Sequence, residues 1–210
     1  MTRAVVWLSS LVLGLTWLLP AAVMSTPPGI CRPMNTLKES LNFTNRRQYM
    51  KHNFPINYTI RVHYEEVFRV HNISRLNRTR EPDPPKLEAR DLQELWLLIN
   101  QEVLKKVLRV LPERHPSRKY VSDLENLFRQ IEQVFRTELG EWETPERLKD
   151  FESLESGTLF RRGKLVKPKA LLDNCYRTMH CVFCDCFQCQ ENFCDVLHWK
   201  RGNKRPPKQA

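Results

Sequence analysis

Four stretches of the chain repeat apolar side chains at the three-and-four spacing of an amphipathic helix. The second stretch, about residues 87–111, ends at Pro112, and the third, about 117–139, ends at Gly140, a residue that favours helix C-termini. Their apolar faces consist of Leu92, Trp96, Ile99, Val103, Val107 and Val110 in one, and Tyr120, Leu124, Leu127, Ile131 and Val134 in the other. Both stretches predict long helices that bury one face.

The first predicted helix begins at a capping box, in which the side chains of Thr36 and Glu39 bond free backbone N–H groups of the first turn. It ends before Pro55. The fourth begins with Pro168 in its first turn, where the missing N–H of proline is not needed. Its apolar stripe consists of Leu172, Cys175, Met179, Val182 and Cys186.

Between the first two helices, the spacing changes to strict alternation from Ile56 to Tyr64, which predicts a half-buried strand. Phe68 and Val70 are expected to form its partner strand after a turn. A short helix is also expected to start at about residues 144–145. Its buried residues would be Leu148, Phe151 and Leu154.

The lengths of the connections indicate how these helices are arranged. About five residues join the second helix to the third, so these two are expected to be antiparallel neighbours. About thirty residues precede the second helix and more than about twenty-five follow the third, and two such crossovers are typical of an up-up-down-down bundle. The expected fold class is all-α with a small β element: a short-chain four-helix cytokine bundle with a short strand pair in the first crossover.

The N-terminus has the order of a cleavable secretory signal. Arg3 precedes an uncharged apolar stretch over residues 4–19, Pro20 breaks this stretch, and small residues follow. The alternative is a membrane anchor, but the apolar run is shorter than the about 20 residues that span a bilayer. We therefore expect a secreted, extracellular protein without membrane insertion. Its expected parts are a signal peptide over 1–25, a four-helix domain over 26–198 and a basic disordered tail over 199–210.

Six of the seven cysteines lie within residues 174–194, and the seventh is Cys31. From Cys181 to Cys189 the pattern is C-x2-C-x-C-x2-C, which also suits tetrahedral zinc, although one residue between the C-x2-C units leaves no room for the usual loop. In an oxidising compartment closely spaced thiols become disulfides. We therefore expect disulfides, with no bound metal and no cofactor.

Four N-x-S/T sequons support the secretory route, because they accept glycans in secreted chains. The expected glycosylation sites are Asn42, Asn57, Asn72 and Asn77. Asn57 falls within the predicted strand, whereas Asn72 and Asn77 follow the strands and precede a polar, proline-rich segment.

The net charge of +10 is concentrated in residues 161–169 and in the tail over 199–210. A basic cluster is most often a solvated surface, and in a secreted protein its functional alternative is binding to sulfated glycosaminoglycans rather than to nucleic acid. The candidate polyanion-binding residues are Arg161, Arg162, Lys164, Lys200, Arg201, Lys204 and Arg205.

The chain contains none of the common catalytic motifs built from histidine, serine or glycine. Its six histidines and acids such as Asp91 and Asp123 form no recognisable constellation, so we expect no catalytic residue and no enzymatic activity. Three binding functions remain: a receptor ligand, a secreted glycan-binding or carrier protein that acts through its basic segments, and, with least support, a zinc-dependent nucleic-acid module.

Three segments resemble the interleukin-34 family: residues 46–76, 115–125 (HPSRKYVSDLE) and 164–179 (KLVKPKALLDNCYRTM). The similarity runs roughly from Cys31 to Cys194. It implies a four-helix cytokine that acts as a homodimer on the macrophage colony-stimulating factor receptor, a receptor tyrosine kinase, and supports monocyte and macrophage survival, proliferation and differentiation. The receptor-binding residues stay unknown, because exposed polar helix faces look alike.

The resemblance also implies two disulfides, Cys31–Cys189 and Cys184–Cys194. Any disulfide of Cys31 fastens the start of the first helix to the C-terminal cluster and closes a long loop, which stabilises the folded chain. At least one of seven cysteines stays unpaired within the chain, and Cys175 and Cys181 are the candidates.

Phe54, Pro55 and Ile56 form an apolar cluster where the first helix ends. Such a cluster either packs into the core of its own chain or forms a self-complementary patch on a two-fold axis. The resemblance favours the second, and the expected homodimer is non-covalent, with these three residues in its interface.

Overall fold

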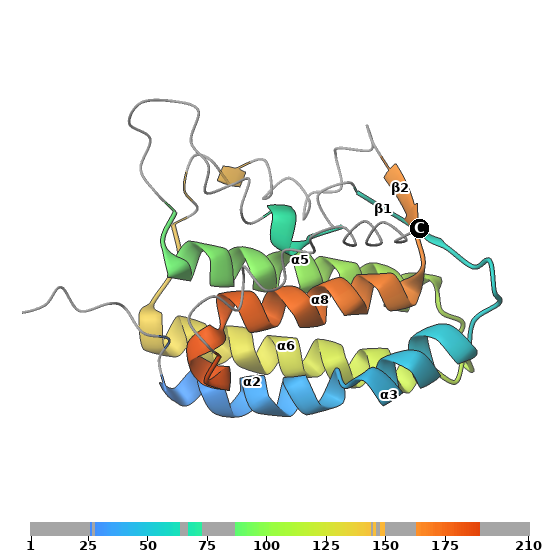
Figure 1. The fold of residues 1–210 in the computed structure, drawn as a ribbon, viewed down its shortest axis with the longest axis horizontal. Coiled ribbons are helices and arrows are strands. Elements are labelled where there is room, and N and C mark those ends of the chain that lie inside the picture. The colour runs from blue at the N-terminus through green and yellow to red at the C-terminus, as the bar shows by residue number, and fades with distance from the viewer. Residues whose placement is uncertain are drawn as a thin grey trace, which may run out of the picture.

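The computed structural model describes residues 26, 28–63, 67–72, 87–143, 145, 148–149 and 163–189. Within these residues the main helices are α2 (Pro28–Ser40), α5 (Ala89–Val110), α6 (Arg118–Leu139) and α8 (Pro168–Val182). They lie side by side, with α2 and α5 running in one direction and α6 and α8 in the other (Figure 1). The predicted helical cytokine fold, with its up-up-down-down order, is therefore confirmed.

The prediction for the start of the first helix was wrong, because α2 begins at Pro28 rather than at Thr36. The apolar stripe of α2 begins with Ile30 and Met34, which are fully buried, so burial extends the helix toward the N-terminus. Inside the helix, the Thr36 hydroxyl donates to the carbonyl of Arg32 instead of capping a first turn. A capping box does occur at α5, where the backbone N–H of Glu88 donates to Asp91.

After α2 the chain continues through a short helix, α3 (Phe43–Arg47), and one π-helical turn, η2 (Gln48–His52). Asn42 caps α3, because its Oδ1 accepts a hydrogen bond from the backbone N–H of Asn45 at 2.8 Å. The predicted first helix is thus three consecutive helical pieces that end before Pro55, as expected.

The predicted strand over residues 56–64 is confirmed only for β1 (Ile60–His63), because Ile56 and Asn57 lie in a turn. The prediction for its partner strand was wrong. β1 pairs antiparallel with β2 (Gly163–Val166), with Ile60 opposite Val166. The pair therefore joins the two crossovers, while Phe68 and Val70 are buried outside the sheet. Alternation in the sequence predicts that a segment is extended, but the tertiary fold decides which other extended segment completes its hydrogen bonds. β2 leads directly into α8 (Figure 1).

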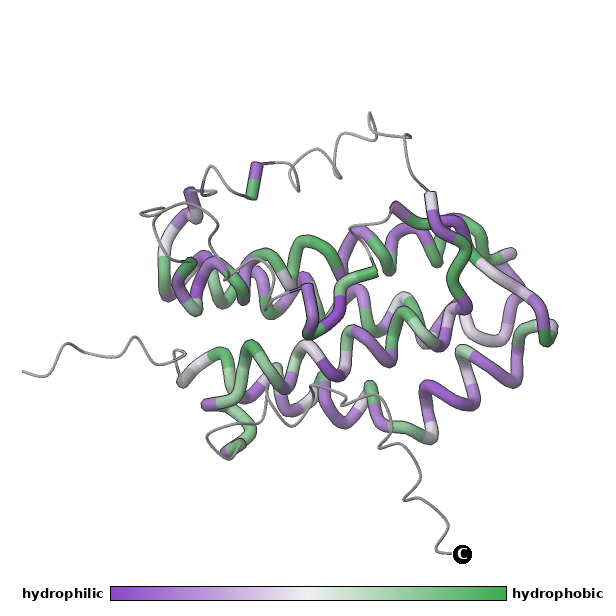
Figure 2. Tube along the Cα trace, turned by 45° about the horizontal axis from the view of Figure 1, so that its top comes forward, coloured by the Kyte–Doolittle hydropathy of each residue, from purple (hydrophilic) through white to green (hydrophobic). Residues whose placement is uncertain are grey.

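Aromatic side chains fill the centre of the bundle. Trp96 of α5 stacks on Phe128 of α6 and meets Phe183 edge-on, with ring centroids 5.0 and 5.2 Å away. Its Nε1–H donates to the hydroxyl of Thr178 in α8 at 3.0 Å, so the buried polar atom is satisfied. Hydrophobic and hydrophilic positions alternate along each helix, as an amphipathic bundle requires (Figure 2).

Gly140 ends α6 as predicted, with a φ of 74° that favours glycine. Its backbone N–H donates to the carbonyl of Arg136 at 3.1 Å. The short helix expected from residues 144–145 lies mostly outside the described residues, but Leu148 is fully buried as expected.

Candidate functional site

The corner at residues 53–58, where an interface was expected, is held against the turn between α5 and α6. The Nδ2 of Asn53 donates to the hydroxyl of Ser117 at 3.1 Å, and that hydroxyl donates to the carbonyl of Tyr49. The Nε2 of His115 lies 3.1 Å from the carbonyl oxygen of Asn53. Since Ser117 is fully buried, these bonds give the corner a defined shape.

The three corner residues differ in exposure. Phe54 is only 8% exposed and packs against Tyr58 and His115, with ring centroids 5.1 and 4.8 Å away. Pro55 is exposed, and Ile56 is 88% exposed. Phe54 therefore belongs to the core of its own chain, whereas Pro55 and Ile56 are available to a partner. The predicted self-association through this corner stays a prediction.

The corner borders a groove of about 850 Å³ between η2 and the first turn of α8. Most of the groove surface is apolar, and the exposed Phe43 and Ile56 both contribute to it. Cationic side chains also line it, from the first crossover, from the N-cap of α8 and from its first turn: Arg47, Lys51, Lys167 and Lys169. The carboxylate of Asp173 in the lining is already paired with Arg46 and Lys169. The groove thus suits a partner that presents apolar and anionic groups together.

Sequence reasoning missed this groove, because Arg47 and Lys167 lie far apart in the chain and only the fold brings them together. Of the predicted polyanion-binding residues, Lys164 lies on β2, close in sequence to the cations of the groove. The others lie outside the described residues: Arg161, Arg162, Lys200, Arg201, Lys204 and Arg205.

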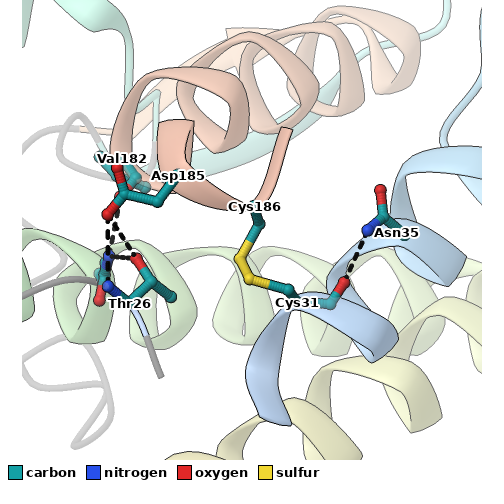
Figure 3. The surroundings of a disulfide bond; sticks show 7 residues. Thr26, Cys31, Asn35, Val182, Asp185 and Cys186 are labelled. Atoms are coloured by element: carbon teal, nitrogen blue, oxygen red, sulfur yellow. Dashed lines mark hydrogen bonds between the residues drawn. A yellow bond between two sulfur atoms is a disulfide. The ribbon is translucent and has the colours of Figure 1, made fainter. Parts of the chain in front are cut away.

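At the opposite end of α8, a disulfide joins Cys31 of α2 to Cys186 in η4 (Cys184–Phe187), with Cα atoms 4.8 Å apart (Figure 3). The predicted Cys31–Cys189 disulfide is therefore wrong, although Cys31 does fasten the first helix to the cluster. The α-helix stops at Val182, and the tighter 3-10 turn that follows packs on α2 and carries Cys186 to Cys31. The sequence prediction assumed one continuous α-helix through Cys186, so it could not indicate this change to a 3-10 turn.

The remaining described cysteines correct a second prediction. Cys184 and Cys189 are free thiols, so Cys184 does not form the predicted disulfide with Cys194. Cys181, a candidate for the unpaired cysteine, is in a disulfide. Cys175, the other candidate, is a buried free thiol, as expected. Burial raises its pKa well above the ordinary range of a thiol.

The expected glycosylation sites lie on the first crossover and the segment before it. Asn42 and Asn57 are exposed, and Asn72 is half-buried. Asn77 lies outside the described residues. The Nδ2 of Asn42, the atom that a glycan modifies, donates to the carbonyl of Glu39 at 2.8 Å. Occupancy of these sites stays a prediction.

Two buried titratable groups outside the groove have shifted pKa values. Burial, with smaller contributions from Lys38 and Arg46, lowers the pKa of His180 to about 4. Burial also raises the pKa of Glu94 above its usual value. Within the described residues, no three His, Cys, Asp or Glu side chains are grouped so that they could hold a metal ion. The described helices include none long and apolar enough to cross a membrane.

A four-helix up-up-down-down bundle with two long crossovers and a short strand pair between them is a helical cytokine fold. The sequence identifies the family within this class, because the model of the interleukin 34 family matches residues 24–191. The chain therefore belongs to the interleukin 34 family, which is a family of cytokines.

Proposed function

We propose that the protein is a secreted cytokine that binds and dimerises the macrophage colony-stimulating factor receptor, and thereby promotes monocyte and macrophage survival, proliferation and differentiation. The observation that carries this proposal is the family match over residues 24–191, which covers the whole described bundle. The helical cytokine fold supports it, because the family is one of cytokines, which act on receptors.

Three features support action outside the cell. The N-terminal apolar stretch resembles a cleavable signal, and sequons lie on the exposed Asn42 and Asn57. The disulfide between Cys31 and Cys186 is of a kind that persists in oxidising compartments.

Receptor dimerisation requires two receptor-binding surfaces, which a symmetric homodimer supplies. The exposed Pro55 and Ile56 support self-association at the corner. The Ile56 side chain is 88% exposed, and its burial in an interface would be favourable through the hydrophobic effect. The hydrogen bonds of Ser117 and Asn53 hold the corner in shape, so little ordering entropy opposes association. The proposed dimer is non-covalent, because Cys31 is committed to Cys186 within the chain and the proposed interface at Pro55 and Ile56 contains no cysteine.

The receptor is tested directly by treating cells that express the macrophage colony-stimulating factor receptor with purified protein and measuring receptor phosphorylation. Phosphorylation that depends on the receptor kinase is expected. Matched cells without the receptor are the control. Lack of phosphorylation by a folded, dimeric protein would refute the proposed receptor.

The dimer is tested with Ile56→Asp, which places a charge in the proposed interface, and with Leu165→Asp as a matched control. Leu165 is also an exposed large apolar residue, 61% exposed, but it lies on β2 outside the groove. Light scattering should give a dimer for the wild type and for Leu165→Asp, and a monomer for Ile56→Asp. A monomeric wild type at signalling concentrations would exclude the crosslinking mechanism, and a dimeric Ile56→Asp would place the interface elsewhere.

The second candidate is a secreted glycan-binding or carrier protein, which the cationic groove favours. Lys51 and Lys167 line the groove from two different segments, as a site for a sulfated chain requires. A combined Lys51→Glu and Lys167→Glu variant should elute from immobilised heparin at lower salt than the wild type. If the protein is only a glycan-binding protein, heparin affinity falls in this variant while receptor phosphorylation is absent in both.

A further inference from the structure

Thr26, which lies just before α2, is fastened to the C-terminal end of the bundle. It is 8% exposed, and its backbone N–H donates to Oδ2 of Asp185 at 3.3 Å (Figure 3). Its hydroxyl lies 3.4 Å from the same oxygen and accepts a hydrogen bond from Nε2 of Gln93 at 2.9 Å. Gln93 also donates to the carbonyl of Val182 at 2.9 Å, so this backbone nitrogen sits at a defined place beside a carboxylate.

Thr26 is also the residue that follows the expected signal peptide. A signal peptidase prefers a small residue immediately before the cleaved bond, and Ser25 occupies this position. Hydrolysis of the bond between Ser25 and Thr26 breaks one C–N bond and consumes one water molecule. The hydroxyl of the water goes to the carbonyl carbon of Ser25, and the nitrogen of Thr26 gains a proton. A second proton from solvent then makes this nitrogen an α-ammonium group at neutral pH.

We propose that removal of residues 1–25 converts the hydrogen bond between Thr26 and Asp185 into an ion pair between the new N-terminal ammonium and the Asp185 carboxylate. This inference rests on the secretion that the proposed function includes. It requires no large movement, because the nitrogen already lies 3.3 Å from Oδ2. A charge-assisted hydrogen bond is roughly twice as strong as a neutral one, so processing strengthens a contact that the fold has already positioned.

The ion pair holds the same two segments as the disulfide. Thr26 lies five residues before Cys31, and Asp185 precedes Cys186 directly. Without an anchor at residue 26, the disulfide at Cys31 is the covalent link between the first turns of α2 and η4. With the anchor, the first turn of α2 is fixed at two points, and the N-terminus of the processed protein becomes a part of the folded bundle rather than a loose end.

The test begins with the full chain secreted from animal cells, whose N-terminal residue is identified by mass spectrometry. We expect Thr26. The reactivity of its α-amine toward an acetylating reagent is then compared between wild type and Asp185→Asn. Only an unprotonated amine reacts, and in the wild type the Asp185 carboxylate stabilises the protonated α-ammonium. The α-amine of Asp185→Asn should therefore react about tenfold faster than that of the wild type, which corresponds to an amine pKa about one unit lower. Asp123→Asn, in an exposed pair with Lys119, is the matched control and should react like the wild type.

A second variant keeps the proposal testable by a measurement other than reactivity. Insertion of Gly-Ser between Ser25 and Thr26 moves the ammonium away from Asp185 and leaves an amide at Thr26. The melting temperature of this insertion variant should be about 2–4 °C lower than that of the wild type. The substitution Asp185→Asn should lower the melting temperature less in the insertion variant than it does in the wild type, because the ion pair is already lost.

Three results would overturn the proposal: an N-terminus other than Thr26, equal amine reactivity in wild type and Asp185→Asn, or equal melting temperatures with and without the insertion. These results leave the proposed receptor untouched, since receptor phosphorylation is measured separately. A chain retained in the cell with residues 1–25 attached would overturn both this inference and the proposed secretion.

Discussion

The guanidinium of Arg46 in α3 forms an ion pair with the carboxylate of Asp173 in α8, a residue 127 positions later in the chain. Arg46 is 6% exposed, and its guanidinium also lies over the ring of Tyr176, 4.4 Å from the centroid. Its Nε–H donates to the carbonyl of Leu41 at 2.7 Å. This single side chain therefore links the end of α2, the start of the first crossover and α8.

Asp173→Asn should destabilise the protein by about 2–3 kcal/mol, because the buried guanidinium of Arg46 loses its counter-charge while the shape of the side chain is kept. Urea unfolding followed by circular dichroism measures the change. Asp123→Asn is the control, since its pair with Lys119 is exposed and should contribute less than about 1 kcal/mol. Equal effects of the two substitutions would contradict this reading of the Arg46 pair.

Replacing both Cys31 and Cys186 by alanine should lower the free energy of unfolding by about 2–5 kcal/mol. The disulfide joins residues 155 positions apart, and such a crosslink strongly restricts the unfolded chain. The midpoint of urea unfolding should shift accordingly. Peptide mapping of the unreduced wild type should recover the Cys31–Cys186 linkage, and a Cys31–Cys189 linkage there would contradict the structure.

Stability should fall with acid in a way that depends on His180. The unfolded histidine takes up a proton near pH 6.5, whereas burial holds the pKa of the folded side chain at about 4. Between these two values only the unfolded state gains the proton, so stability is complete above pH 6.5 and decreases as the pH falls toward 4.

The stability difference between pH 7 and pH 4.5 should therefore be smaller by about 1–3 kcal/mol in His180→Gln than in the wild type. Lys38 of α2 and Arg46 of α3 are the nearby charges that lower the pKa further, and both are cationic over this range. His71→Gln, at an exposed position, serves as the control and should retain the wild-type pH dependence. An unchanged acid response in His180→Gln would show that other groups cause it.

Native Cys175 should resist alkylation at pH 8. It is 2% exposed, and burial raises its pKa, so both access and the thiolate fraction are low. Cys189 should also react slowly, because burial and a hydrogen bond with Cys184 raise its pKa to about 12. Mass spectrometry after iodoacetamide treatment, with and without urea, gives the labelling of each site. Labelling of Cys175 as fast in the native protein as in urea would contradict its burial.

The sequence by itself determined the elements that depend on short-range patterns. The apolar face that includes Val103 predicts α5, the face that includes Leu124 predicts α6, and each helix was placed within two residues at both ends. Gly140 and Pro168 marked a helix end and a helix start correctly, because these residues act through their own backbone conformation. The connection lengths then indicated the order of the helices, since a short link permits only antiparallel neighbours.

Only the tertiary structure decided the relationships between distant segments. The partner of β1, the partner of Cys31, the cationic groove and the contact between Thr26 and Asp185 all join residues about 100 or more positions apart. A helical or alternating pattern states which face of a segment is buried, but not which other segment covers it. That choice depends on how all the apolar faces are buried at once, and it brought Cys186, rather than Cys189, to Cys31.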